Sequence, residues 1–276
     1  MAGLLESEEP GGPTSGRTIL AGEGLQHHDG HSHVLASVIP SCRAYDPCFA
    51  DELTMILEHG TQSMLVDYEC AFYYLTLANE SNSHPPLPAV GDVREGIIRG
   101  IYPLREWAAD SRHRVQRLGS RPILREVLAA ADLLEENWGV GAAVWSVTTF
   151  TDLHRDALEV ERWNRLHPQA TRRTPFITRC LAGRAEPAMA ASDHLKIHAD
   201  QVRTFVPGRY KALGTDVFGR SDDRAQLRRF FEIDARFITF VRLAALADEG
   251  LLTPAQVTSA AEQYEIDPER PIPILL

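Results

Sequence analysis

Four histidines, His27, His28, His31 and His33, lie within seven positions of one glycine-containing segment. The segment begins at Gly22, and these are four of the eleven histidines in the chain. Glycines disfavour a regular helix, and a loop that leads into a strand can direct several imidazoles into one cavity. Imidazole titrates near neutrality, so such a group could move protons or stabilise a developing negative charge. The cluster therefore predicts a catalytic loop.

Two other interpretations of this loop stay open on the residues alone. His27, His31 and His33 could supply three nitrogen ligands to a metal ion, although no Cys or Glu motif at ligand spacing accompanies them. The loop could also be an ordinary solvated surface segment. The composition favours the catalytic interpretation, because clusters of titratable groups in loops are typical of functional sites.

The residues after the loop predict the elements that hold it. A strand is expected over residues 34–39, and a helix is expected to open at Asp46 and Pro47, with Asp46 as its cap. The apolar face of that helix would consist of Phe49, Leu53, Ile56, Leu57 and Met64. A second strand is expected over residues 70–77, and the proline cluster that follows it marks the best domain boundary.

Beyond that boundary, short apolar runs alternate with stretches of helical period, which is typical of an α/β fold with a largely parallel sheet. The expected strands are residues 114–118, 142–148 and 210–213. The expected helices are residues 120–139, 193–204, 234–248 and 253–264. The chain would thus have a first domain over residues 1–90, which carries the histidine loop, and a second α/β domain over residues 91–276.

The first of these domains has too few elements to close a core by itself. Two strands and one helix in roughly 90 residues would leave a sheet edge unpaired, and an exposed apolar edge promotes association. We therefore expect the missing strands to come from another chain.

The composition excludes several classes of protein. With 276 residues, 44% of them hydrophobic and 24% charged, the chain resembles an ordinary globular protein. The balance of 28 basic against 38 acidic residues gives a net charge of −10, which argues against nucleic acid as a partner. The best uncharged run, residues 138–151, is too short and polar to span a membrane. The first sixteen residues lack a secretory signal and the four cysteines form no CxxC pair, so a cytoplasmic location with free thiols is expected.

Several longer motifs carry a specific resemblance. Residues 14–33, TSGRTILAGEGLQHHDGHSH, resemble the histidine loop of the homodimeric E1 component of bacterial pyruvate dehydrogenase, a thiamine-diphosphate-dependent member of the transketolase superfamily. Further motifs follow in the order of that family: Ile39-Pro40-Ser41-Cys42, Trp138-Gly139-Val140-Gly141, Glu161-Arg162-Trp163-Asn164, Leu213-Gly214-Thr215-Asp216 and Phe218-Gly219-Arg220-Ser221-Asp222. The resemblance runs from about residue 13 to about residue 266.

The resemblance implies that the chain is similar to the last third of that enzyme. It would hold the end of a transketolase-type pyrimidine-binding domain, followed by a transketolase C-terminal-like α/β domain with a mostly parallel sheet. His27 would face the coenzyme as a catalytic and coenzyme-binding residue, with His31 and His33 as further catalytic contacts.

The family's Gly-Asp-Gly motif, which holds Mg²⁺ and the coenzyme phosphates, has no counterpart here, because Gly91-Asp92-Val93 lacks the second glycine. Thiamine diphosphate and Mg²⁺ are therefore expected to be held mainly by a partner chain that carries the diphosphate-binding domain and the remainder of the pyrimidine domain. This chain itself is expected to supply no metal ligand.

Three residues depart from the family's pattern. His28 stands where an acid is usual, Val217 replaces a glycine, and Asn82 replaces a tyrosine. The change at His28 alters the charge of the loop, so the substrate could differ from pyruvate.

The resemblance implies an enzyme that works as part of a complex. The expected reaction is decarboxylation of pyruvate, with passage of the two-carbon unit to a lipoyl or acyl carrier protein. One alternative is transketolase-like transfer of a ketol unit from a ketose phosphate to a carrier protein; others are a non-catalytic docking module and a metal-binding protein. The Glu161-Arg162-Trp163-Asn164 motif could dock a carrier domain, although a packed corner with local ion pairs is the commoner role of such a motif.

Overall fold

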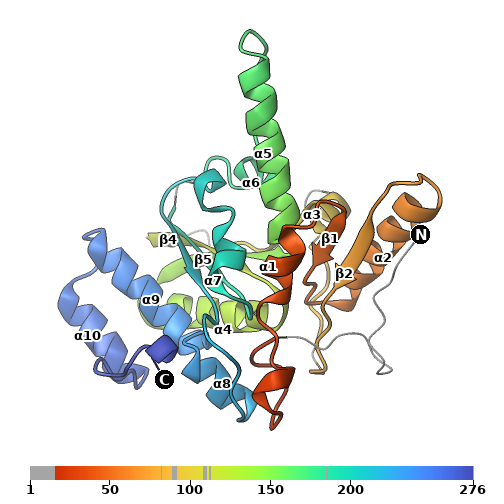
Figure 1. Cartoon of the computed structure of the whole chain (residues 1–276). Coiled ribbons are helices and arrows are strands. Elements are labelled where there is room, and N and C mark those ends of the chain that lie inside the picture. Colours follow the sequence, from red (N-terminus) through yellow and green to blue (C-terminus); the bar gives the residue numbers. More distant parts are fainter. Residues whose placement is uncertain are drawn as a thin grey trace.

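The computed structural model describes residues 16–81, 83–88, 92–107, 111, 113–184 and 186–275. The predicted domain boundary at residues 90 and 91, Asn82 and nearly all of the N-terminal stretch lie outside these described residues. The described chain forms two sheets that lie next to each other, one of two strands and one of five, with helices packed around them (Figure 1). No described helix is both long and apolar enough to cross a membrane.

The small sheet contains strands β1 (Cys42–Tyr45) and β2 (Phe72–Leu75), which pair in parallel. Helix α2 (Ala50–Leu65) connects them, and helix α1 (Ser32–Ser37) precedes β1. The strand predicted over residues 70–77 is confirmed in a shorter form, whereas β1 was not predicted. Among the described residues no third strand joins this sheet. Its completion by another chain stays a prediction.

The predicted strand over residues 34–39 is wrong, because most of this segment belongs to helix α1. Burial recurs at a spacing of three residues: His33 and Ala36 are buried, whereas Leu35 and Val38 are exposed. That spacing is helical and differs from the two-residue alternation of a half-buried strand.

The start of α2 also differs from the prediction, because Asp46 does not cap the helix. The helix begins at Ala50, and the carboxylate of Glu52 accepts the backbone N–H groups of the two residues that precede it. The predicted apolar face is correct at Ile56, which is buried, but Leu57 is 45% exposed. The Asp46 side chain instead enters the interior, where it is only 1% exposed.

The large sheet has the strand order β3-β5-β4-β6-β7. Its strands are β3 (Ile101–Arg105), β4 (His113–Gly119), β5 (Val140–Val147), β6 (Ala188–Ala191) and β7 (Tyr210–Leu213). Strand β3 is antiparallel to β5 and all other neighbours are parallel, which confirms a mostly parallel sheet. The predicted strands correspond to β4, β5 and β7, whereas β3 and β6 were not predicted.

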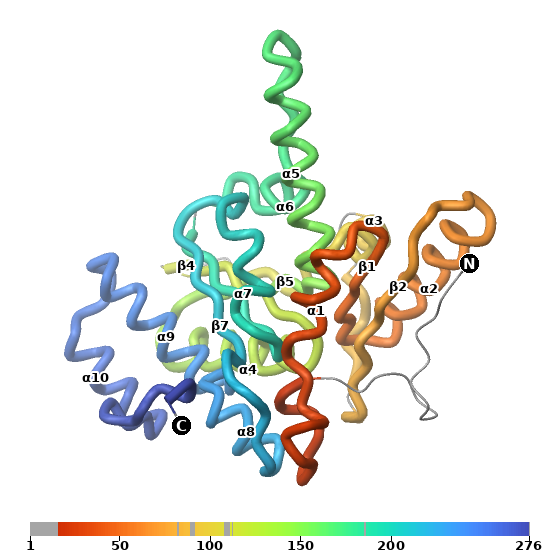
Figure 2. Tube along the Cα trace, viewed as in Figure 1, coloured from red at the N-terminus to blue at the C-terminus, as the bar shows by residue number. Residues whose placement is uncertain are grey.

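Helices cover both faces of the large sheet. One face packs against α4 (Arg121–Trp138), α9 (Ala235–Asp248) and α10 (Pro254–Gln263). The other packs against α5 (Phe150–Leu166), α6 (Phe176–Cys180) and α7 (Lys196–Asp200). The far end of α5 projects from the body of the molecule (Figure 2). Helices α3 (Val93–Arg99) and α8 (Arg224–Phe230) complete the fold.

Local signals placed three of these helices correctly. Helix α4 follows Ser120 and ends at Gly139, which adopts a φ of 61° that favours glycine. Helices α9 and α10 also lie where they were predicted. The helix predicted over residues 193–204 is wrong in extent, because only the five residues of α7 and a short 3-10 turn, Arg203–Phe205, are helical.

Buried polar contacts join the small sheet to the large one. One carboxylate oxygen of Glu52 accepts hydrogen bonds from the hydroxyl groups of Tyr102 on β3 and Ser146 on β5. The backbone N–H of Asp46 donates to the carbonyl of Thr148, at 2.7 Å. These contacts fix the segment after β1 against the end of β5.

Candidate active site

The histidine loop is held in place by polar contacts at several points. After the 3-10 turn Leu25–His27, the Asp29 carboxylate accepts the backbone N–H groups of His31 and Ser32, at 2.9 and 3.0 Å, and so opens helix α1. The carbonyl of Gly30 accepts the backbone N–H of Leu195, which precedes α7. Asp29 and Gly30 therefore shape the loop.

The loop sends the three predicted catalytic histidines in different directions. His27 is exposed, His31 is half-buried, and His33 is fully buried inside the molecule. Within the part of the chain that the structure describes, these three imidazoles do not form a group close enough to bind one metal ion. The catalytic roles predicted for His27, His31 and His33 stay predictions, and the fold keeps His33 apart from the surface of the loop.

Arg17 organises the inner side of the loop. One terminal nitrogen of its guanidinium donates to Nδ1 of His31, at 3.0 Å, and the other donates to the carbonyl of His28. The ring of His28 is buried, and its Nδ1–H donates to the carbonyl of Arg17 at 2.7 Å. His28 thus points inward. Because His31 accepts at Nδ1, its hydrogen lies on Nε2, where it can donate to another group.

His31 lines an open cavity of about 400 Å³. The cavity is lined by Leu25, His31, Asp216, Val217, Phe218, Gly219, Arg220, Pro273 and Ile274. It combines an imidazole, a guanidinium and a carboxylate with apolar side chains, of which Phe218 is 74% exposed. The ring of His31 lies 6.0 Å from that of Phe218. This mixture of few polar groups and apolar walls is typical of a small-molecule site or of its rim at an interface.

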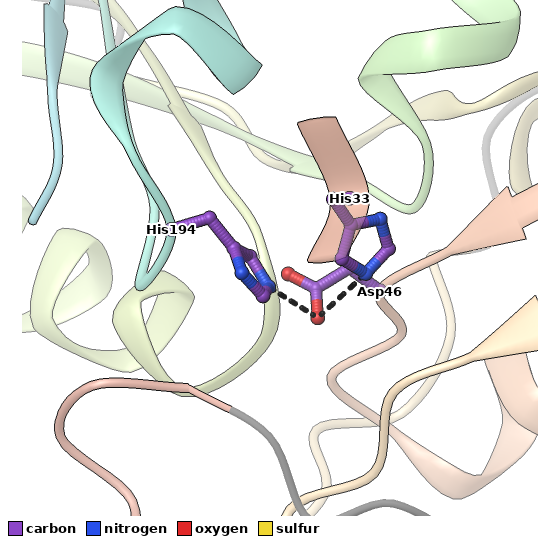
Figure 3. A group of neighbouring side chains, drawn as sticks. All are labelled: His33, Asp46 and His194. Atoms are coloured by element: carbon purple, nitrogen blue, oxygen red, sulfur yellow. Dashed lines mark ion pairs between the residues drawn. The ribbon is translucent and has the colours of Figure 1, made fainter. Parts of the chain in front are cut away.

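A second group of histidines lies in the interior behind the loop. His33 of α1 and His194 before α7 both approach Oδ1 of Asp46, with their Nε2 atoms 3.9 and 3.4 Å away (Figure 3). His198 of α7 packs against both rings, with centroid distances of 4.8 Å to His33 and 5.4 Å to His194. This group was not predicted from the sequence, although the four-residue spacing of His194 and His198 in a predicted helix was an available signal.

Neighbouring polar groups satisfy the Asp46 carboxylate. The Thr76 hydroxyl donates to Oδ1 and the Ser120 hydroxyl donates to Oδ2, while an Arg121 nitrogen lies 3.7 Å from Oδ1. Burial alone would raise the pKa of Asp46, but His194 and Arg121 outweigh it and hold the pKa of this carboxyl well below its usual value. Asp46 is therefore a buried anion.

Burial has the opposite effect on two of the imidazoles. It lowers the pKa of His33 to about 3, with a further contribution from His194, and it lowers the pKa of His198 well below its usual value. Both rings are therefore neutral near pH 7. A neutral imidazole is a hydrogen-bonding group or a metal ligand and carries no positive charge.

The motif at Trp163 forms a packed corner at the end of α5. The ring of His167 stacks on Trp163 with a centroid distance of 4.4 Å, and the Arg173 guanidinium lies 3.9 Å from the centre of the same ring. Asn164 exchanges two hydrogen bonds with the backbone of Arg173. These local contacts account for the motif as a structural feature.

Two family models match the chain. Residues 8–85 match the pyruvate dehydrogenase E1 component middle domain, and residues 100–234 match the transketolase-like C-terminal domain. The small sheet and the histidine loop thus fall within the first match, and the large sheet falls within the second.

Curated relatives agree with these matches. The chain is 50% identical over 264 residues to the pyruvate dehydrogenase E1 component of Pseudomonas aeruginosa, and 45% identical over 266 residues to that of Escherichia coli K12. These alignments cover 95% and 96% of the chain. The chain spans about 30% of the length of these relatives.

Solved structures of transketolases share the fold. A transketolase from Campylobacter jejuni matches 83% of this chain and 30% of its own, with a TM-score of 0.57 at 14% identity. A structure described as a split gene transketolase, an inactive beta4 tetramer, matches 83% of this chain and 64% of its own, with a TM-score of 0.51 at 16% identity. At these identities the likeness concerns the fold, and it confirms the predicted transketolase-type α/β class. The chain therefore carries matches to the pyruvate dehydrogenase E1 middle domain and the transketolase-like C-terminal domain, and it is similar to the C-terminal part of pyruvate dehydrogenase E1 components.

Proposed function

We propose that this chain supplies one wall of the active site of a thiamine-diphosphate-dependent E1-type enzyme whose diphosphate-binding half lies on another polypeptide. The reaction would be decarboxylation of pyruvate and passage of the two-carbon unit to a lipoyl or acyl carrier protein, in the cytoplasm. The observation that carries the proposal is the histidine loop, whose base is fixed by Asp29 and Arg17 while His27 is exposed and His31 faces an open cavity.

The residues present fit the reacting end of the coenzyme but not its phosphates. The Asp92 side chain accepts the backbone N–H of Glu95 at 2.9 Å and caps α3, so this contact gives the carboxylate a structural role. His27 and His31 offer imidazole nitrogens at the surface, which suit the reaction side of a coenzyme bound by another polypeptide. When bound, thiamine diphosphate supplies a carbon nucleophile and an electron sink.

The chain's own residues would then orient groups and move protons. His31 lines the cavity, and because Arg17 donates to its Nδ1 its hydrogen lies on Nε2, from which it would donate a hydrogen bond to a developing negative charge. His27 is free to exchange protons with a reacting group, since its side chain is exposed. The buried His33 would act through its packing beneath the loop and not by touching the substrate.

Two departures from the family's pattern, His28 and Val217, lead to different expectations for the substrate. His28, the departure that raised doubt about pyruvate, is turned inward onto the Arg17 carbonyl and adds no group to the cavity surface. Pyruvate therefore stays the first candidate. Val217, the other departure within the described residues, does line the cavity. A bulkier residue at that position would favour a different substrate, so ketol transfer from a ketose phosphate is the second candidate.

The surroundings of the cavity support a partner polypeptide. Leu25, Phe218 and Ile274 line this cavity and are between 58% and 74% exposed, which suits a surface that another protein covers. A split gene transketolase among the structures with this fold shows that a transketolase can be divided between genes.

Reconstitution tests the proposal. The chain would be combined with a polypeptide that carries the diphosphate-binding and remaining pyrimidine domains, and product formation would be measured with pyruvate and with a ketose phosphate. His27→Ala should lower kcat by about 10² to 10³, whereas His167→Ala, at an exposed histidine on the far end of α5, should leave it nearly unchanged. Turnover of neither substrate by a complex that forms stably would contradict the enzymatic proposal and favour a docking module.

A further inference from the structure

Three buried side chains from three separate elements bring possible metal ligands together. His33 comes from α1, Asp46 from the turn after β1, and His194 from the turn after β6. One ligand atom of each lies within 4.8 Å of those of the other two, and the three side chains are at most 1% exposed. Figure 3 shows both imidazoles directed at one oxygen of the Asp46 carboxylate.

The histidines of this group have unused hydrogen-bonding capacity. Among the described residues, Nδ1 of His33 and Nδ1 of His194 have no hydrogen-bond partner. The nitrogens that face Asp46 are the two Nε2 atoms: that of His194 lies 3.4 Å from Oδ1, and that of His33 hydrogen-bonds to the Thr76 hydroxyl at 3.0 Å, a contact that a bound ion would replace. His198, which packs on both rings, likewise has two nitrogens without such a partner. Leaving a buried polar group without a partner is unfavourable, so several such nitrogens in one place indicate a bound group that would satisfy them.

We infer that His33, Asp46 and His194 bind a divalent transition-metal ion of the Zn²⁺ class. Two imidazoles and one carboxylate suit Zn²⁺ and its neighbours in the first transition series far better than Mg²⁺ or Ca²⁺, which prefer oxygen ligands. The nitrogen-to-oxygen distances of 3.4 and 3.9 Å approach the roughly 3.3 Å between ligand atoms that tetrahedral bonds of about 2.0–2.1 Å imply.

The surroundings of the ligands resemble those of a metal site. The Ser120 hydroxyl donates to Oδ2 of Asp46 at 2.9 Å, and the Thr76 hydroxyl donates to Oδ1, the oxygen that the two histidines approach. Such outer contacts orient the ligands of protein metal sites. The Arg121 nitrogen, 3.7 Å from Oδ1, opposes a second cation, so the affinity should be lower than that of a site without a neighbouring positive charge.

The inferred site does not depend on the proposed reaction. His33 and Asp46 belong to the segment that matches the E1 middle domain, and His194 belongs to the segment that matches the transketolase-like C-terminal domain. A bound ion would therefore link the two and stabilise their contact.

Metal titration of the full chain tests the inference without coenzyme or partner. After treatment with chelator, the chain would be titrated with Zn²⁺ alone and with Co²⁺ alone, and its metal content would be measured by mass spectrometry. We expect one Zn²⁺ per chain, a visible absorption band with Co²⁺, and a rise in melting temperature. His194→Gln should weaken binding by about 100-fold or more, since loss of an outer contact alone costs 10- to 100-fold. His167→Gln, at an exposed histidine, is the matched control and should bind as the natural chain does.

Two results would overturn the inference. One is Zn²⁺ binding by the natural chain far below one equivalent, with no Co²⁺ band; this measurement needs no variant and holds even if His194→Gln fails to fold. The other is a folded His194→Gln variant that binds Zn²⁺ as tightly as the control, which would place the ion on surface histidines. Neither result bears on turnover by the reconstituted complex.

Discussion

Replacing Glu52 with alanine should lower the free energy of unfolding by about 3–5 kcal/mol, because two buried N–H groups lose their acceptor at about 1–3 kcal/mol each and a cavity is left. The side chain is fully buried. Its carboxylate accepts the two backbone N–H groups before α2 and the hydroxyl groups of Tyr102 and Ser146. The two hydroxyl groups can rotate toward other acceptors, whereas the backbone groups cannot.

Glu52→Gln is the matched control for this loss. The amide has the same shape, keeps one oxygen for the two N–H groups, and can donate to the oxygens of Tyr102 and Ser146. Urea denaturation followed by circular dichroism at pH 7 should place it within about 1.5 kcal/mol of the natural chain. If glutamine were as damaging as alanine, these hydrogen bonds would not be the cause of the loss.

The natural chain and the Glu52→Gln variant together also test the protonation of this buried carboxyl group. Burial raises the pKa of Glu52 above its usual value of 4.5, and the hydrogen bond from Ser146 only partly offsets this. The folded state therefore keeps the proton to a higher pH than the unfolded state does. The contribution of this proton to the free energy of unfolding is fully present below pH 4.5. It is lost as the pH rises through the raised pKa of Glu52, by at most about 1.4 kcal/mol per pH unit. The natural chain should thus lose stability relative to Glu52→Gln as the pH rises above 4.5, and a relative gain would refute the reasoning.

Three other substitutions test the loop and its supports. Arg155 donates to three backbone carbonyls from the end of α1 to the start of β1. Arg155→Ala should therefore lower the free energy of unfolding by about 2–4 kcal/mol and speed amide hydrogen exchange in this segment, with Arg155→Lys intermediate. Unchanged exchange would contradict this. A Cβ atom at Gly219 would overlap the His28 side chain, so Gly219→Ala should lower the free energy of unfolding by about 1–3 kcal/mol and reduce turnover by the reconstituted complex. An unchanged melting temperature would show that the loop shifts to accommodate the methyl group without loss of stability. His27→Ala should leave the urea midpoint nearly unchanged, since the side chain is exposed, while kcat falls about 10²- to 10³-fold; full activity would remove His27 from the mechanism.

The sequence predicted elements whose signals are local. Helix α4 carries a capping position at Ser120, a proline in its first turn and Gly139 at its end, and its bounds match the prediction. Strand β6 was missed because its residues, AMAA, contain no β-branched or aromatic side chain. It becomes a strand because β4 and β7 pair with it on both sides, and that pairing depends on the rest of the fold.

The histidine loop was recognisable from its amino-acid sequence, whereas the interior group behind it was not predicted, because only the spacing of His194 and His198 is visible in the sequence. Asp46 stands directly before a proline, as helix caps often do, yet it enters the interior because its carboxylate is satisfied there by Ser120 and Arg121. His194 lies far along the chain from His33, and only the packing of α7 beside α1 brings the two rings to 4.5 Å. Contacts between segments that lie far apart in the sequence produce no recognisable spacing of residues.

Binding of thiamine diphosphate, measured by calorimetry with Mg²⁺ present, tests most directly whether the histidine loop completes a coenzyme pocket on another polypeptide. The chain alone should show no binding, and the reconstituted complex should bind the coenzyme. Tight binding by the isolated chain would contradict the proposal, and so would a complex in which the loop stays as accessible to chemical modification with the coenzyme as without it.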